Sequence, residues 1–155
     1  MKNIVGAILV ITLLALLPVA MLRDHNVAHA ATGCTAATLT GNYGFTENVG
    51  FITLASRSPA LFTPAARLGL IPFSGGSGST GTFTISFAQS VNGNIISDQS
   101  SGPYTVNSDC TGSINLVTGN AAGEVYAISI VSGGTEVLAM RTDPGATIDA
   151  TMKKQ

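Results

Sequence analysis

The sequence predicts an all-β fold, a single eight-stranded antiparallel up-and-down barrel that follows an N-terminal signal peptide. Three observations support this prediction. Apolar and polar residues alternate with a period of two in short segments separated by turn residues. Patterns with the period of a helix are nearly absent after the N-terminal segment. The length of 155 residues fits one domain.

The first 30 residues have the layout of a secretory signal peptide. Lys2 gives a positive start, the run Ile4–Leu22 is apolar, and Ala28-His29-Ala30 offers a small-x-small cleavage site. We therefore expect cleavage between Ala30 and Ala31, which leaves residues 31–155 as one β-barrel domain, secreted or periplasmic. The apolar run is also long enough to span a bilayer, so an uncleaved N-terminal anchor is the alternative.

The clearest strand is predicted at Thr82–Phe87, where hydroxyl residues alternate with large hydrophobic ones. One face of this strand should meet a core and the other should meet water. Asn92-Gly93 follows and favours a tight hairpin, because both residue types tolerate a positive φ. The returning strand begins at Asn94–Ser97. The same alternation, bounded by turn residues, predicts the remaining strands at Asn42–Glu47, Leu68–Phe73, Tyr104–Val106, Thr111–Val117, Val125–Val131, Glu136–Arg141 and Ala146–Met152.

From these nine segments we predict eight strands, most of them joined by tight turns. Closing such a meander into a barrel removes both of its free edges. Eight strands enclose a lumen that side chains just fill, or that holds one small ligand. A β-sandwich is the alternative, although the long crossovers it needs are scarce. The apolar segment Val49–Pro64 fits neither architecture directly, and we expect a lid over the barrel mouth or an irregular edge strand.

The two cysteines, Cys34 and Cys110, both lie in the part expected to be exported. An oxidising compartment favours their pairing, so we predict a structural disulfide. Both histidines, His25 and His29, fall in the segment expected to be removed. The domain would then lack the imidazole that Ser-His-Asp and Cys-His catalysis require. We expect no metal site and no cofactor, because two distant cysteines are too few ligands for zinc.

Carboxylates are the remaining candidates for chemistry. Glu136 shares a strand face with Leu138 and Met140, and Glu47 shares one with Phe45, so either carboxylate could point into the barrel. For both we favour a solvated position at the end of a strand. Basic residues are few and form no patch, so we do not expect a nucleic-acid partner.

Aromatic residues suggest where a ligand could bind. Phe83, Phe87, Tyr104 and Tyr126 could line the lumen and contact a small ligand. An ordinary filled core is the alternative. The strand Val125–Val131 is apolar on both faces, which predicts a cover from outside the barrel, and we expect a contact between subunits of a homo-oligomer.

Three runs carry a resemblance to known proteins: Leu39–Phe45 (LTGNYGF), Phe73–Gly78 (FSGGSG) and Gly102–Gly112 (GPYTVNSDCTG). In this order after a signal peptide, they resemble a group of small secreted bacterial proteins of uncharacterised function. These proteins are similar to calycin-type or allene-oxide-cyclase-like eight-stranded barrels. The resemblance implies a fold, with a ligand-sized lumen in some relatives, and it assigns no catalytic residue.

Three functional hypotheses follow. The favoured one is an exported, non-enzymatic barrel that binds a small apolar or amphipathic ligand and has no membrane contact after cleavage. The second is a structural barrel of the envelope or the extracellular space that works through protein contacts. The third is a cyclase- or isomerase-like enzyme, which would need Glu47 or Glu136 inside the barrel.

Overall fold

A computed structural model describes residues 33–53 and 62–155 of the chain. The expected signal peptide, its cleavage site at Ala30 and Ala31, both histidines and residues 54–61 of the apolar insertion lie outside the described residues. Within the described part, no helix is long and apolar enough to cross a membrane.

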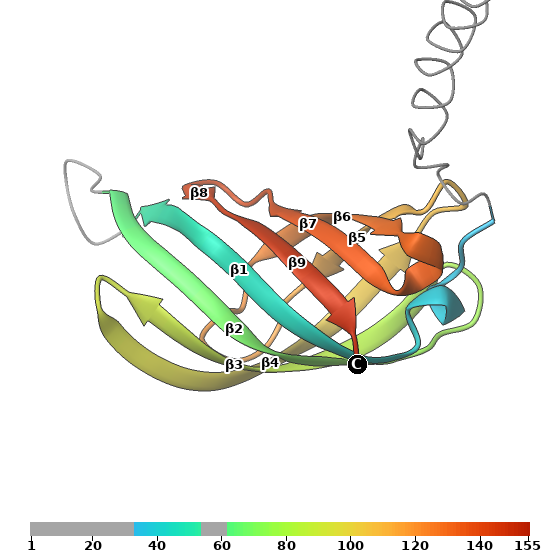
Figure 1. Ribbon diagram of the computed structural model, residues 1–155, viewed down its shortest axis with the longest axis horizontal. Helices are drawn as coiled ribbons and strands as arrows, with labels where there is room; N and C mark the ends of the chain where they lie inside the picture. Colours follow the sequence, from blue (N-terminus) through green and yellow to red (C-terminus); the bar gives the residue numbers. More distant parts are fainter. Residues whose placement is uncertain (1–32, 54–61) are drawn as a thin grey trace, which may run out of the picture.

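Residues 33–53 and 62–155 form a single antiparallel sheet with two short 3-10 helices (Figure 1). The helices are η1 (Ala36–Leu39) and η2 (Ser132–Gly134). The strands are β1 (Gly41–Thr53), β2 (Phe62–Ser74), β3 (Thr80–Val91), β4 (Asn94–Val106), β5 (Thr111–Asn115), β6 (Val125–Val131), β7 (Glu136–Arg141), β8 (Ala146–Thr147) and β9 (Asp149–Lys154).

The sheet closes on itself, because β1 pairs with β2 on one side and with β9 on the other. Neighbours in space otherwise follow the order of the chain, which is the up-and-down topology. The two-residue strand β8 pairs with Phe51 and Ile52, beyond the end of the β9 pairing, so β8 and β9 form one wall strand interrupted at Ile148. The prediction of a closed eight-stranded antiparallel barrel is thereby confirmed.

Several predicted strand boundaries differ from the structure. Asn94–Ser97 and Tyr104–Val106 are the two ends of one long strand, β4. The flanks of the apolar insertion are not a lid, because Gly50 pairs with Ala65 and Thr53 pairs with Phe62. These pairs lengthen β1 and β2, so the flanks extend the barrel wall, and the strands β1 to β4 are about twice as long as β5 to β7.

Inward-facing and outward-facing residues alternate along the strands, and the inward-facing ones are mostly large and apolar, so they fill the interior. Three of them, Tyr43, Phe73 and Tyr104, pack edge to face, with ring centroids 5.3 Å and 5.1 Å apart for the two pairs that include Phe73. The interior cavity lined by Phe45, Phe83 and their neighbours measures only about 10 Å³. That space holds about one water molecule, so side chains fill the described lumen.

Residues 33–39, which include η1, cover the end of the barrel at which these aromatic rings lie. Leu39 of η1 is fully buried, and the hydroxyl of Tyr104 donates a hydrogen bond to the carbonyl oxygen of Ala36 at 2.8 Å. A disulfide joins Cys34 to Cys110, as predicted, and attaches this segment to the turn between β4 and β5. A structural disulfide of this kind is typical of proteins in oxidising compartments.

Candidate functional site

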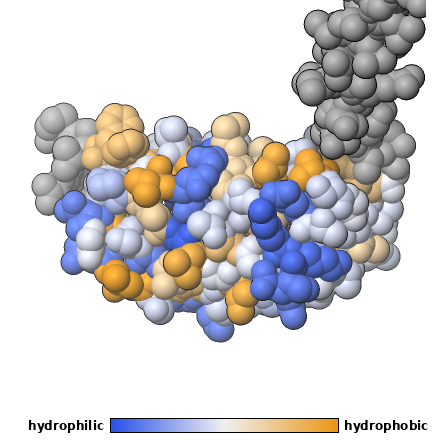
Figure 2. Space-filling model, viewed as in Figure 1, coloured by the Kyte–Doolittle hydropathy of each residue, from blue (hydrophilic) through white to orange (hydrophobic). Residues whose placement is uncertain are grey.

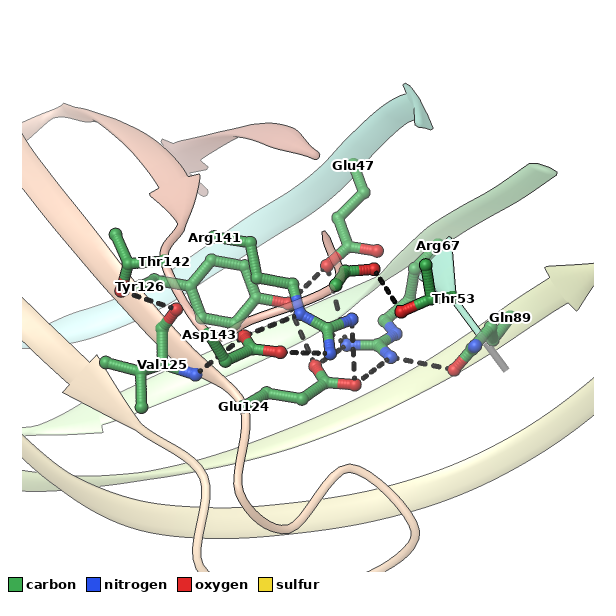
Figure 3. A network of polar contacts seen from close by, with 11 residues as sticks. Glu47, Thr53, Arg67, Gln89, Glu124, Val125, Tyr126, Arg141, Thr142 and Asp143 are labelled. Carbon is green, nitrogen blue, oxygen red and sulfur yellow. Dashed lines mark hydrogen bonds and ion pairs between the residues drawn. The ribbon is translucent and has the colours of Figure 1, made fainter. Parts of the chain in front are cut away.

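A network of charged side chains crosses the interior of the barrel at the level of Glu47, which follows Tyr43 by four residues on β1 (Figure 3). Glu47 of β1 lies opposite Arg67 of β2, and Arg67 lies opposite Gln89 of β3, so all three share one row of the inner face. The other members come from the far wall of the barrel. They are Glu124 just before β6, Tyr126 of β6, Arg141 of β7 and Asp143 in the following turn.

Arg67 is the centre of this network. Its Nη1 and Nη2 atoms donate to the two carboxylate oxygens of Glu124 at 2.7 Å and 2.9 Å, and Nη2 also donates to Gln89 at 2.7 Å. The guanidinium carbon lies 4.4 Å from the centroid of the Phe87 ring, in the position of a cation–π contact. Burial opposes the charge of Arg67, but Glu124 and Glu47 outweigh that penalty and raise its pKa. Arg67 therefore carries a fixed positive charge inside the barrel.

Arg141 forms the second ion pair of the network. It donates to both oxygens of Asp143 at 2.8 Å, and its Nη1 lies 3.2 Å from Glu124 Oε1. The backbone N–H of Val125 donates to Asp143 at 3.2 Å. Burial opposes ionisation of Asp143, but these hydrogen bonds outweigh it and hold the pKa of Asp143 below its ordinary value. Glu124 and Asp143 thus form the closest ion pairs with the two guanidinium groups.

Glu47 has the weakest ionic partner of the three acidic side chains. Its closest guanidinium nitrogen is Arg67 Nη1 at 3.4 Å, an atom that Glu124 already engages at 2.7 Å. The Tyr126 hydroxyl makes a short contact with Glu47 Oε1 and lies 3.0 Å from Glu124 Oε2. Burial raises the pKa of Glu47 against the opposing effects of Arg67 and Tyr126. Burial and the two nearby carboxylates also raise the pKa of Tyr126.

The position of Glu47 corrects the prediction of a solvated strand end. Its side chain is 1% exposed, because β1 continues to Thr53 and places Glu47 in the middle of a strand on the inner face. Glu136, for which we also considered an inward position, faces outward with Leu138, since Val137 and the alternate residues after it point inward.

Sequence reasoning missed Arg67, Glu124 and Arg141 as members of an interior site. A signal was present for Arg67, which has the same strand parity as the buried residues Ile71 and Phe73. A charged residue on the apolar face of a strand indicates an interior partner, because an unpaired buried charge is costly.

The four aromatic residues proposed as ligand contacts all point inward, but at different heights. Tyr104 lies beneath η1, whereas Phe87 lies against the Arg67 guanidinium. Phe83 and Tyr126 line the cavity of about 10 Å³. The described residues therefore leave no ligand-sized space that all four share, and their role in ligand binding stays a prediction.

A larger hollow lies outside the barrel wall, with a volume of about 320 Å³. Its lining includes Glu47, Arg67 and Gln89 of the inner row, together with residues of the opposite parity. Those residues face outward, and they are Thr46, Ala66, Leu68, Ala88, Ser90 and Ile95. We call these six residues the outer groove.

The outer groove is mainly apolar and open to solvent. Leu68 is 63% exposed and Ile95 is 75% exposed. A neighbouring hollow shares Leu68 and Ala88 and continues the groove towards Leu70. Figure 2 shows hydrophobic residues interspersed with hydrophilic ones on the face of the molecule that carries β1 and β2. Large apolar side chains exposed next to one another often mark a binding surface.

The polar residues described do not form a metal centre. Across residues 33–53 and 62–155, no group of three or more Cys, His, Asp or Glu side chains lies in an arrangement that could hold a metal ion. The carboxylates of the interior network instead contact arginine and tyrosine side chains, which makes it an ion-pair network enclosed by the barrel.

Comparison with known proteins supports the fold. No family model and no curated protein sequence matches the chain. A solved redesigned β barrel matches with a TM-score of 0.53 and 16% sequence identity, over 79% of this chain and 96% of that one.

Two other redesigned barrels, mFAP0 and mFAP1, were solved bound to DFHBI. Each matches with a TM-score of 0.46 and 16% identity, over 76% and 77% of this chain and 99% and 98% of theirs. At this identity, the likeness of the first barrel concerns the fold alone. Together with the closed eight-stranded sheet, it supports a calycin-like β-barrel.

Proposed function

We propose that this chain is a non-enzymatic β-barrel that binds a small apolar or amphipathic ligand in the outer groove. The proposal rests mainly on the volume of the groove. At about 320 Å³ it falls within the roughly 300–1,000 Å³ of typical small-molecule sites. Its lining includes the apolar residues Leu68, Ala88 and Ile95 and the hydroxyl residues Thr46 and Ser90.

The interior supports this placement of the ligand. The cavity between Phe83 and Tyr126 holds about one water molecule, so a ligand there would have to displace core side chains. The same limit bears on a cyclase-like enzyme. Glu47 meets the requirement of a carboxylate inside the barrel, but the interior cavity lined by its partners Arg67 and Tyr126 measures only about 10 Å³, which is too small for a substrate.

The ligand-binding proposal is tested by titrating the disulfide-intact chain with an environment-sensitive apolar dye, followed by displacement with alkyl amphiphiles. We expect Leu68→Gln to weaken binding, because the amide removes apolar contact area from the groove. Leu138→Gln on β7 is the matched control, since Leu138 is also exposed and lies outside the groove. The proposal fails if the dye does not bind, or if Leu68→Gln and Leu138→Gln bind it as the unsubstituted chain does.

A second candidate function is contact with other protein chains through the outer face of β6 and β7. Leu138 and Met140 are 47% and 59% exposed there, beside a shallow hollow that includes Ala127. This arrangement agrees with a homo-oligomer or a structural role in the envelope. Light scattering of the purified chain tests it: a strict monomer at high concentration, unchanged by Met140→Gln, would contradict self-association.

We further propose that the domain acts after export, with residues 1–30 removed as a signal peptide. The disulfide between Cys34 and Cys110 supports an oxidising compartment. Mass determination of the exported product tests the cleavage. A mature N-terminus at Ala31 is expected, whereas a product that keeps residues 1–30 would favour the membrane anchor.

A further inference from the structure

The carboxylates of the interior network outnumber its cations. Among residues 33–53 and 62–155, Glu47, Glu124 and Asp143 face two guanidinium groups, those of Arg67 and Arg141. The side chains of these five residues are between 1% and 15% exposed. With every group ionised, these five residues would carry one uncompensated negative charge, which is costly in a medium of low polarity.

The geometry shows which carboxylate is left without a full ion pair. Glu124 receives two hydrogen bonds from Arg67 and lies 3.2 Å from Arg141, and Asp143 receives two from Arg141. Among the described residues, the only ion pair of Glu47 is its 3.4 Å contact with Arg67 Nη1. Glu47 is therefore the carboxyl group for which protonation costs the least interaction energy.

The Tyr126 hydroxyl gives an independent reason for an extra proton. Its oxygen lies within hydrogen-bonding distance of Glu47 Oε1 and of Glu124 Oε2, yet a hydroxyl has one hydrogen to donate. Two ionised carboxylates cannot both be satisfied by this group. A proton on Glu47 removes the conflict: Glu47 donates to Tyr126, and Tyr126 donates to Glu124.

We propose that Glu47 is protonated in the folded protein at neutral pH and that its proton completes a Glu47–Tyr126–Glu124 hydrogen-bond chain across the barrel. The chain joins β1 to β6, which do not pair in the sheet. Loss of this proton at higher pH would place a second carboxylate against Tyr126 and Glu124. The same proton thus makes this end of the barrel sensitive to alkaline pH.

The described groups on the strands around Glu47 support this assignment. Arg67 of β2 is the closest cation, and Gln89 of β3 is uncharged and engaged with Arg67. Arg141 of β7 contacts Glu124 and Asp143. On β9, the residue opposite Glu47 is Ala150, which does not titrate.

Infrared spectroscopy of the full disulfide-intact chain tests the proposal directly. A protonated carboxyl group has a C=O stretch that a carboxylate lacks. We expect this signal in the folded protein at about pH 7. It should disappear on unfolding, because a solvated carboxyl group is ionised at about pH 7, and it should disappear on alkaline titration, because the proton is then removed. A folded protein with no protonated carboxyl signal at about pH 7 would overturn the proposal, whether or not any variant folds.

Glu47→Gln then assigns the proton to one residue. The amide is uncharged and can still donate to Tyr126, so this variant should fold, lose the protonated carboxyl signal and keep a constant melting temperature between about pH 6 and pH 9. Over the same range the melting temperature of the unsubstituted chain should fall. Glu136→Gln, at a partly exposed position on β7, is the control and should retain both the signal and the fall. Retention of the signal in Glu47→Gln would refute the assignment.

Discussion

Arg67 on β2 and Glu124 beside β6 form a two-point ion pair across the inside of the barrel, with N–O distances of 2.7 Å and 2.9 Å. The strands β2 and β6 are not neighbours in the sheet, because β3, β4 and β5 separate them along the wall. This pair therefore links two opposite walls through the interior, where water competes little with it and leaving one charge alone is expensive.

Replacement of Arg67 should be among the most damaging single changes in the network. Arg67→Met removes the charge that Glu124 and Glu47 contact, and should lower the free energy of unfolding by about 3–5 kcal/mol. Urea unfolding followed by circular dichroism measures the change. The double variant Arg67→Met, Glu124→Gln should recover part of the loss, because it no longer leaves Glu124 charged without a partner. A cost below about 1 kcal/mol for Arg67→Met would contradict this account.

The disulfide should stabilise the end of the barrel that η1 covers. Cys34 and Cys110 are separated by 76 residues, and opening a loop of that length should cost roughly 4 kcal/mol through the entropy of the unfolded chain. We expect the double variant Cys34→Ser, Cys110→Ser to unfold at lower urea concentration. Hydrogen exchange should accelerate first in Ala36–Leu39, because these residues attach to the barrel beside the disulfide. Equal stability of the two proteins would show that η1 is held without the disulfide.

Gly69 should tolerate no side chain, because β2 and β3 approach closely there. A Cβ atom added at Gly69 would lie 2.1 Å from the carbonyl oxygen of Ser86 and 2.8 Å from the Cα of Phe87, both backbone atoms. Gly69→Ala should therefore shift the strands and destabilise the fold by about 1–3 kcal/mol. Leu70→Ala, at the next and exposed position, is the control and should cost much less. Thermal unfolding of the two variants compares them, and an equal effect would contradict the close approach.

Asp143 should contribute to loss of stability in acid. Its pKa is lowered in the folded state, so the unfolded chain binds a proton at higher pH than the folded chain does. The stabilisation is therefore complete above the ordinary aspartate pKa of 3.8 and is lost as the pH falls through the lowered value. Asp143→Asn should reduce stability at neutral pH and flatten the acid limb of the stability profile. Denaturant unfolding from about pH 2 to pH 7 checks both effects, and an unchanged acid limb would exclude this role.

Much of the wall could be predicted from local patterns. Alternation in Thr82–Phe87 correctly placed Phe83 and Phe87 inside, and Asn92-Gly93 marked the turn between β3 and β4. The two cysteines indicated their own pairing because no other cysteine is present. Strand alternation and the turn depend on residues next to one another in the chain, and two cysteines allow one intramolecular disulfide. The sequence alone therefore determines these features.

The candidate site depended on the tertiary structure. Alternation along a strand shows which side of the wall Glu47 or Arg67 faces. It does not show which residue on a distant strand lies at the same height along the barrel. Register around the closed barrel sets that height, and it brings Glu124, Tyr126 and Arg141 to the row that contains Arg67. The sequence thus determined a closed β wall with an apolar interior. Only the barrel's closure decided that a charged network crosses it, because charges 57 residues apart meet only when opposite walls are brought into register.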